Sequence, residues 1–286
     1  MRHRPRPTRC DLQTGSAAGW LLGTVVVCVL VGLGAWHMLY WGENLRSAGF
    51  DYPATSPPAS CARAGDVQTD PDFPRLRVRA PTNYRRDHAH GLLVVFSPAG
   101  FGPALTERFM GLTRTATEHG LIVAYVGSRP MSEALAARLT RVPQIVARDW
   151  CIDASRIAFV GHSDGGTLAQ VVALQSPTPG MLRPTAIVAS GAGLLESDFG
   201  TFDCAAAGKP DVLIVHGRND RHFPDYGASA TRGWARCLKC AADPVTDERD
   251  CQHHAGCRGR LTFCQHEGRH WTWPDAARQS SVDAAD

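Results

Sequence analysis

RIAFVGHSDGG, residues 156–166, joins a short apolar segment typical of a strand to a glycine-rich turn, and residues 167–174 continue with helical composition. A G-x-S-x-G motif between a strand and a helix places a nucleophilic serine, here Ser163, on a sharp bend. Gly161 and Gly165 leave room where the backbones of strand and helix come close. The stretch predicts an α/β fold with a reactive serine, although an ordinary glycine-rich connection has the same composition.

Other apolar segments alternate with helical patterns along the chain. Buried strands are predicted at 91–96, 121–126, 157–160, 185–190 and 212–216, with short strands at 76–79 and 261–263. Helices are predicted at 107–119 and at 132–150, the second interrupted by Pro143. This alternation predicts a mainly parallel sheet with helices on both faces over residues 75–276. In such sheets the active site lies at the carboxyl ends of the strands.

A serine hydroxyl needs a histidine base, and the histidine needs an acid. Asp220 follows the predicted strand at 212–216 and is our candidate acid, with Asp225 as the alternative. His270 follows the last predicted strand and is our candidate base, with His266 as the alternative. The chain order serine, acid, histidine is that of α/β-hydrolases, although aspartates in turns and histidines in loops are also common without any catalytic role.

The N-terminal part predicts a membrane anchor. Residues 1–16 form a basic tail, and residues 17–41 form a nearly uncharged apolar run long enough to cross a bilayer. We interpret this run as an uncleaved signal-anchor that leaves the N-terminus cytoplasmic and exports the rest; a long signal peptide and a buried globular helix are the alternatives. Residues 42–74, rich in proline, are predicted to be an extended tether, and residues 277–286 a polar C-terminal tail.

Charge and cysteine usage fit an exported domain. The formal net charge of +3 is confined to the first 46 residues, so nothing calls for nucleic acid or another polyanion as a partner. Eight cysteines lie beyond the apolar run, an even number that favours disulfides in an exported protein. Cys237, Cys240, Cys251 and Cys257, with His253 and His254, could instead form a zinc module. We favour disulfides, with the two histidines as solvated loop residues, and expect no metal or cofactor.

A resemblance to a known family rests on three segments: residues 152–166, residues 214–220 and the tail GRHWTWP at 268–274. They resemble the α/β-hydrolase esterases of the polyhydroxybutyrate depolymerase and feruloyl esterase group, as does Trp234 shortly before Cys237. The resemblance covers about residues 75–275 and implies Ser163 as nucleophile, Asp220 as acid and His270 as base. The family more often has one residue, where this chain has two, between its histidine and Trp-Pro.

The loop after the first buried strand departs from that family, which usually has His-Gly followed by small residues there. This chain has FSPAGF at 96–101, and Pro98 has no amide hydrogen to donate. The predicted oxyanion hole therefore combines the amide of Asp164 with one from Ala99, Gly100 or Phe101.

These observations predict a membrane-anchored serine esterase that acts on carboxylic esters, of the polyhydroxyalkanoate or feruloyl type, through an acyl-enzyme. The alternative is an exported binding domain whose altered oxyanion loop has lost turnover. A peptidase of the same fold is a further possibility, since the same triad cleaves amides. His222, Phe223, Trp271 and Trp273 are positioned to line the pocket, and the sequence leaves the oligomeric state open.

Overall fold

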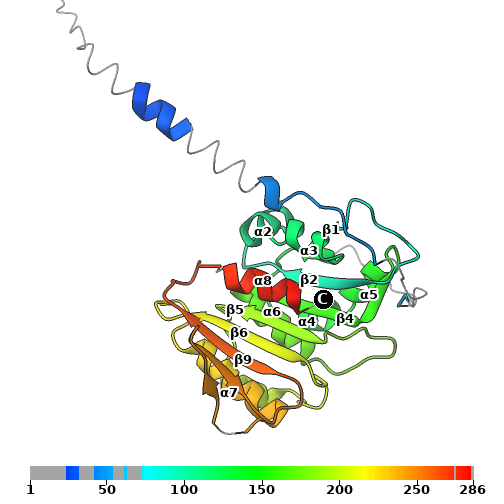
Figure 1. The fold of residues 1–286 in the computed structure, drawn as a ribbon. Coiled ribbons are helices and arrows are strands. Elements are labelled where there is room, and N and C mark those ends of the chain that lie inside the picture. Colours follow the sequence, from blue (N-terminus) through cyan, green and yellow to red (C-terminus); the bar gives the residue numbers. More distant parts are fainter. Residues whose placement is uncertain are drawn as a thin grey trace, which may run out of the picture. The chain divides into compact units, whose positions relative to one another are not determined.

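The computed structural model describes residues 24–31, 42–53, 61–62, 73–241, 243–273 and 275–284 (Figure 1). The chain divides into two compact units, Met1–Glu43 and Asn44–Asp286. The second unit contains the sheet and every candidate site residue.

The predicted membrane anchor falls mostly outside the described residues, as does the basic tail. Within the predicted span, residues 24–31 are helical and exposed to solvent. Among the residues that the structure describes, no helix combines the length and the apolar character that a bilayer crossing requires.

A single sheet organises the second unit. Within the described residues it has nine strands in the order β1-β3-β2-β4-β5-β6-β9-β8-β7. The six central strands are mutually parallel, whereas β1 at one edge and β8 and β7 at the other run antiparallel to their neighbours. The strands are β1 Leu76–Arg79, β2 His90–Phe96, β3 Ile122–Val126, β4 Ile152–His162, β5 Ala186–Ser190, β6 Asp211–Gly217, β7 Val245–Thr246, β8 Cys251–His254 and β9 Leu261–His266.

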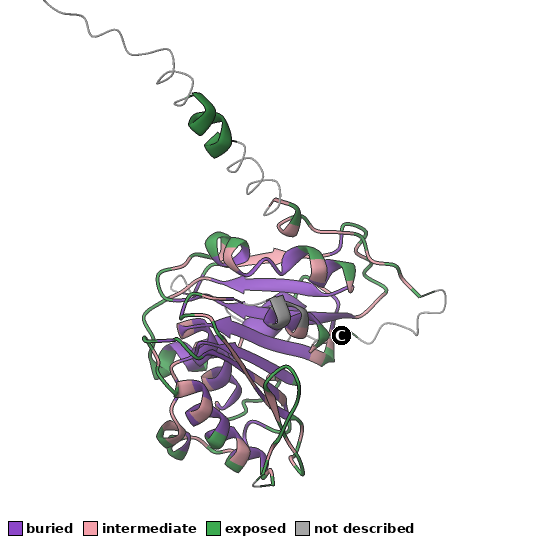
Figure 2. Ribbon diagram, turned by 60° about the vertical axis from the view of Figure 1, so that its left-hand side comes forward, coloured by how far each residue is buried: buried purple, intermediate pink, exposed green. Residues whose placement is uncertain are grey.

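Helices cover both faces of this sheet, which appears in Figure 2 as a buried layer between more exposed helices. One core cluster joins the sheet to α4, α5, α6 and α7, and a second joins the opposite face to α2, α3 and α8. The helices are α2 Pro103–Met110, α3 Thr113–Glu118, α4 Glu133–Leu139, α5 Val142–Ala147, α6 Asp164–Ala173, α7 Tyr226–Leu238 and α8 Asp275–Asp283, with a 3₁₀ helix, η1, at Glu196–Thr201. The predicted α/β architecture with a mainly parallel sheet is confirmed.

Two of the predicted helices are divided. The helix predicted at 107–119 is two helices, because Gly111 adopts a left-handed conformation (φ 61°) and ends α2. The helix predicted at 132–150 is divided into α4 and α5, and Pro143 lies in the first turn of α5, where its missing amide hydrogen costs no hydrogen bond.

The predicted C-terminal tail at 277–286 is wrong for most of its length. Residues 275–283 form α8, in which Ala277 and Val282 are buried against the sheet. The segment is polar in overall composition, but its few apolar side chains fall where they can face the core, and a periodicity this weak does not predict a helix.

The predicted tether at 42–74 is also partly wrong. The amide of Ala48 donates to Thr117 Oγ1 at 2.8 Å, and that of Phe50 to Asn83 Oδ1 at 2.9 Å. Cys61 forms a disulfide with Cys151, and Phe73 is buried. Ala48, Phe50, Cys61 and Phe73 are therefore attached to the folded unit, by contacts that a proline-rich composition does not reveal.

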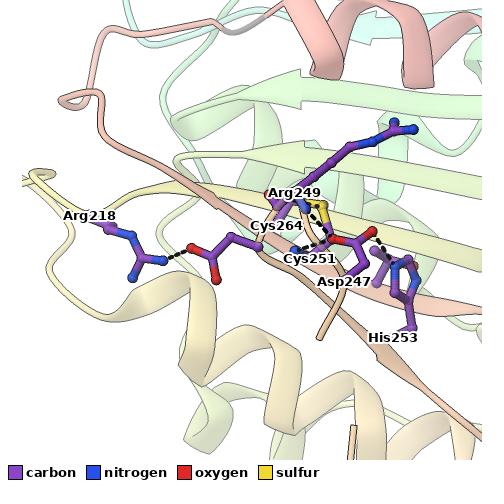
Figure 3. The surroundings of a disulfide bond; sticks show 8 residues. Arg218, Asp247, Arg249, Cys251, His253 and Cys264 are labelled. Atoms are coloured by element: carbon purple, nitrogen blue, oxygen red, sulfur yellow. Dashed lines mark hydrogen bonds and ion pairs between the residues drawn. A yellow bond between two sulfur atoms is a disulfide. The ribbon is translucent and has the colours of Figure 1, made fainter. Parts of the chain in front are cut away.

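Four disulfides connect the cysteines beyond the apolar run: Cys61–Cys151, Cys204–Cys237, Cys240–Cys257 and Cys251–Cys264. Figure 3 shows the last of these, which joins directly opposed residues of β8 and β9. The zinc hypothesis fails for these sulfur atoms, because none is a free thiolate. His253 lies on β8 rather than in a loop and hydrogen bonds to Asp247 at 2.9 Å.

Candidate active site

The turn between β4 and α6 holds Ser163 in a backbone conformation that L-residues rarely adopt, with φ 55° and ψ −128°. The backbone on either side fixes it there. The amide of Ser163 donates to Ser190 O at 2.9 Å, and its carbonyl accepts from Thr167 N at 3.0 Å. Such strain persists only where the surroundings determine it, and here it projects the hydroxyl from the carboxyl end of β4.

The glycines of G-x-S-x-G are required by close backbone contact. A Cβ at Gly161 would lie 2.1 Å from the backbone of Gly165, and a Cβ at Gly165 would lie 2.1 Å from Phe96 O. Strand β4 and helix α6 thus approach each other, and the end of β2, more closely than any side chain allows.

Three side chains that are distant in sequence meet at this edge of the sheet. Ser163 Oγ lies 2.9 Å from His270 Nε2, and His270 Nδ1 lies 2.9 Å from Asp220 Oδ2. Because an ionised carboxylate can only accept, His270 donates Nδ1–H to Asp220 and presents Nε2 to the serine hydroxyl. All three side chains are buried. The arrangement can transfer the serine proton to the imidazole.

Asp220 is held as an ionised acceptor. Its Oδ1 accepts the amides of His222 at 2.8 Å and Phe223 at 3.0 Å, and its Oδ2 accepts from His270. Burial acts to raise the pKa of Asp220, but the hydrogen bond from His270 and the two amide bonds outweigh it, so the pKa lies below its usual value.

The alternative residues occupy other positions. Asp225 lies at the N-terminal end of α7 in a left-handed conformation (φ 62°), without a side-chain capping bond. His266 ends β9, and its Nδ1 accepts the amide of Gly268 at 3.0 Å, which shapes the turn that leads to His270. The structure therefore brings Asp220 and His270, rather than Asp225 and His266, to Ser163.

Two further histidines support the site. His162 is fully buried, with its ring centroid 5.4 Å from that of His270, and burial lowers its pKa to about 3, with His270 acting in the same direction. His216 Nε2 donates to Phe223 O at 2.8 Å and so fixes the loop that carries Asp220. Neither residue is among the sequence-predicted site residues, although His162 lies within the G-x-S-x-G motif and His216 lies four residues before Asp220.

Of the predicted oxyanion residues, Asp164 directly follows Ser163, and Ala99 and Gly100 lie in the loop after β2. Asp164 is the first residue of α6, where amides have no partner within the helix. Phe96 at the end of β2 is paired with Gly161, which brings the loop 97–101 beside the nucleophile. In that loop the amide of Phe101 donates to Pro98 O at 3.1 Å, with Gly100 at φ 75°. This turn occupies the amide of Phe101 and leaves those of Ala99 and Gly100, both exposed, as candidate donors.

The residues predicted to line the pocket differ in their exposure and in their contacts with His270. Trp273 is buried and packs in the core, whereas Trp271 is 55% exposed, with its ring centroid 5.2 Å from that of His270. His222 and Phe223 lie on His270 as well, with ring centroids at 4.6 and 5.3 Å.

Comparison with known proteins supports the fold. No family model and no curated protein matches the sequence. Among solved structures, the chain is similar to the fluorophosphonate-binding serine hydrolase FphF of Staphylococcus aureus, with 14% identity and a TM-score of 0.53 over 76% of this chain and 95% of that one.

It is also similar to the esterase Est2 of Thermogutta terrifontis, with 18% identity and a TM-score of 0.50 over 82% of this chain and 94% of that one. A third similar structure is an S-formylglutathione hydrolase of Agrobacterium tumefaciens, with 16% identity and a TM-score of 0.50 over 73% of this chain and 86% of that one. The chain has the α/β-hydrolase fold, and at these identities the likeness carries the fold alone.

Proposed function

We propose that this chain is a serine esterase that hydrolyses carboxylic esters through an acyl-enzyme. One observation carries the proposal: Ser163, His270 and Asp220 are joined by two 2.9 Å hydrogen bonds at the carboxyl ends of β4, β9 and β6. The strained backbone of Ser163 supports it, because a positive φ at a non-glycine residue costs about 1–3 kcal/mol and is concentrated at functional sites. Solved esterases of the same fold add support.

In the first step, Ser163 Oγ attacks the ester carbonyl carbon while His270 Nε2 accepts its proton. The carbonyl oxygen becomes an oxyanion, held by the amide of Asp164 and one from Ala99 or Gly100. His270 then gives the proton to the alcohol oxygen as the C–O bond breaks. In the second step, water loses a proton to His270 and attacks the acyl carbon, and the acid leaves as Ser163 recovers its proton. Asp220 holds the imidazole in the tautomer that each transfer requires.

The direct test compares Ser163→Ala with Ser155→Ala in the full-length chain. Ser155 is an exposed serine on the same strand. On p-nitrophenyl butyrate, we expect Ser163→Ala to lower kcat by about 10⁴-fold or more and Ser155→Ala to leave it unchanged. Equal turnover of the two variants would refute the proposal.

The same chain also tests the hypothesis of an inactive binding domain, which rests on the altered oxyanion loop. A fluorophosphonate probe requires an activated serine. Labelling of the wild type at Ser163, with none in Ser163→Ala, supports the esterase. A folded wild-type chain that neither reacts with the probe nor turns over esters supports the binding domain.

We further propose an exported domain, anchored by residues 17–41 and acting on esters of the polyhydroxyalkanoate or feruloyl type. Three features support this: the basic N-terminus before an apolar run, the four disulfides, which form in oxidising compartments, and the resemblance of residues 268–274 to that esterase group. Recovery of the full-length chain in the membrane fraction after a carbonate wash, with the domain accessible to added protease, is the expected result. A chain released by the wash would contradict the anchor.

A further inference from the structure

The surroundings of His270 contain an exposed aromatic side chain that the proposed reaction does not use. Trp271 is 55% exposed, one of the largest exposures of any large apolar residue in the described part of the folded unit. Because its ring also lies beside that of the catalytic base, Trp271 presents apolar surface where a substrate must approach.

Trp271 is also held in place. Its ring stacks on Phe101 with centroids 5.9 Å apart and an angle of 10° between the planes. Phe109 of α2 stands perpendicular to both, with centroids 5.9 Å from Phe101 and 6.3 Å from Trp271. The ring of the buried His162 also packs there, with its centroid 6.0 Å from that of Trp271. A ring fixed by its neighbours loses little freedom when a ligand stacks on it, which favours binding.

The position of this ring relates it to one half of the substrate. In the proposed reaction His270 Nε2 must come within hydrogen-bond reach of the alcohol oxygen of the ester, so the alcohol lies beside the imidazole. Trp271 is the next residue, and its ring meets that of His270 edge to face, with centroids at 5.2 Å. The ring of His222 also contacts that of His270, with centroids 4.6 Å apart.

We propose that Trp271 is a specificity-determining residue that stacks on the alcohol half of the ester, and that this alcohol carries a ring with an apolar face. The inference rests on the proposed esterase function and deepens it. Two sources share this chemistry, an aryl ring and the face of a pyranose. Aromatic stacking contributes enough to raise the preference for such an alcohol about 5- to 10-fold.

The test uses butyrate esters of benzyl alcohol and of hexanol, which share the acyl group and differ in the shape of an apolar alcohol. We expect the wild type to favour the benzyl ester in kcat/KM. Trp271→Ala should lower that preference about 5- to 10-fold, and Trp271→Phe should retain most of it. Val245→Ala, which shortens an exposed apolar side chain on the distant strand β7, is the matched control and should change nothing.

A second series keeps the alcohol constant and varies the acid, with ethyl phenylacetate against ethyl butyrate. Trp271→Ala should leave this ratio unchanged. An effect confined to the acyl series, or an unchanged benzyl preference in a folded Trp271→Ala variant, overturns the inference. If Trp271→Ala still hydrolyses ethyl butyrate, the esterase proposal holds even where the inference about Trp271 fails. The failure of the inference can therefore be told from a failure of the proposed function.

Acyl transfer in the wild type provides a readout that depends on no variant. The acyl-enzyme gives its acyl group to an added alcohol, which forms a new ester and restores the Ser163 hydroxyl. Partition toward benzyl alcohol or methyl xylopyranoside, several-fold above hexanol at equal concentration, supports the subsite and tells the aryl source from the saccharide one. Equal partition to hexanol and to both ring alcohols overturns it.

Discussion

The centre of the sheet and its cystine-linked edge are held together by different means. In the centre, β2, β3 and β5 are buried along their whole length. At the cystine-linked edge, which we define as residues 240–257 with β7 and β8, the strands are mostly accessible. There two disulfides, Cys240–Cys257 and Cys251–Cys264, and hydrogen bonds such as the one between His253 and Asp247 replace the missing apolar contacts.

The catalytic groups are distributed unevenly between these two regions. Ser163 and Asp220 follow β4 and β6 of the buried centre, whereas His270 follows β9, which is parallel to β6 on one side and antiparallel to β8 on the other. The base is therefore carried by the strand at which the two regions meet.

The largest expected effect concerns the acid in the centre. Asp220→Asn should lower kcat on p-nitrophenyl butyrate by about 10⁴-fold, because an amide can hold His270 in the wrong tautomer. The oxygen of the introduced amide can still accept the backbone N–H groups of His222 and Phe223, so we expect the variant to stay folded. Asp225→Asn is the matched control and should keep nearly full activity. An inactive Asp225→Asn with an active Asp220→Asn would reverse the assignment.

Stability should depend most on the buried centre. Trp234 on α7 is fully buried, and its Nε1 donates to Gln170 Oε1 of α6 at 2.8 Å. Trp234→Ala should lower the free energy of unfolding by about 3–5 kcal/mol, through lost burial and an unsatisfied amide oxygen. Urea denaturation followed by far-UV circular dichroism measures this change. A loss below about 1 kcal/mol would mean that α7 contributes little to the core.

The disulfide at the edge should contribute less. Replacing both Cys251 and Cys264 by serine opens a loop with a sequence separation of 13 and should lower the free energy of unfolding by about 3 kcal/mol. We expect kcat to remain nearly unchanged, because β9 keeps its pairing with β6 from Leu261 to His266. A large loss of kcat with little loss of stability would show that the edge, and not the centre, positions His270.

The two regions should also differ in how their stability depends on pH. Burial lowers the folded-state pKa of His162 to about 3, against about 6.5 in an unfolded chain. Between these values the unfolded state binds more protons, so this group makes stability fall as the pH is lowered, by up to about 1.4 kcal/mol per pH unit.

His162→Phe should therefore flatten the pH dependence of the urea midpoint between about pH 6.5 and 4. His253→Gln, which removes an exposed histidine at the cystine-linked edge, should leave most of that dependence in place. The opposite order of the two variants would place the acid-sensitive group at the edge.

Local signals in the sequence were sufficient for the central strands and for the three catalytic candidates. Each of those strands is a short apolar segment, and each candidate side chain follows one of them. The same approach did not identify β7, which has only two residues, or β8, whose residues CQHH do not form an apolar segment. It also missed α8, in which the buried side chains are few.

By itself, the sequence determined the α/β order of elements, the strained serine turn and the candidate residues Ser163, Asp220 and His270. The spacing of apolar residues and of glycines carries this information, because it depends only on residues that are close together in the chain. Only the tertiary structure decided which cysteines pair, how residues 48–53 attach to the domain and that Asp220, not Asp225, reaches His270. Those contacts join residues far apart in the chain, and their geometry depends on strand register and on how the loops between strands pack.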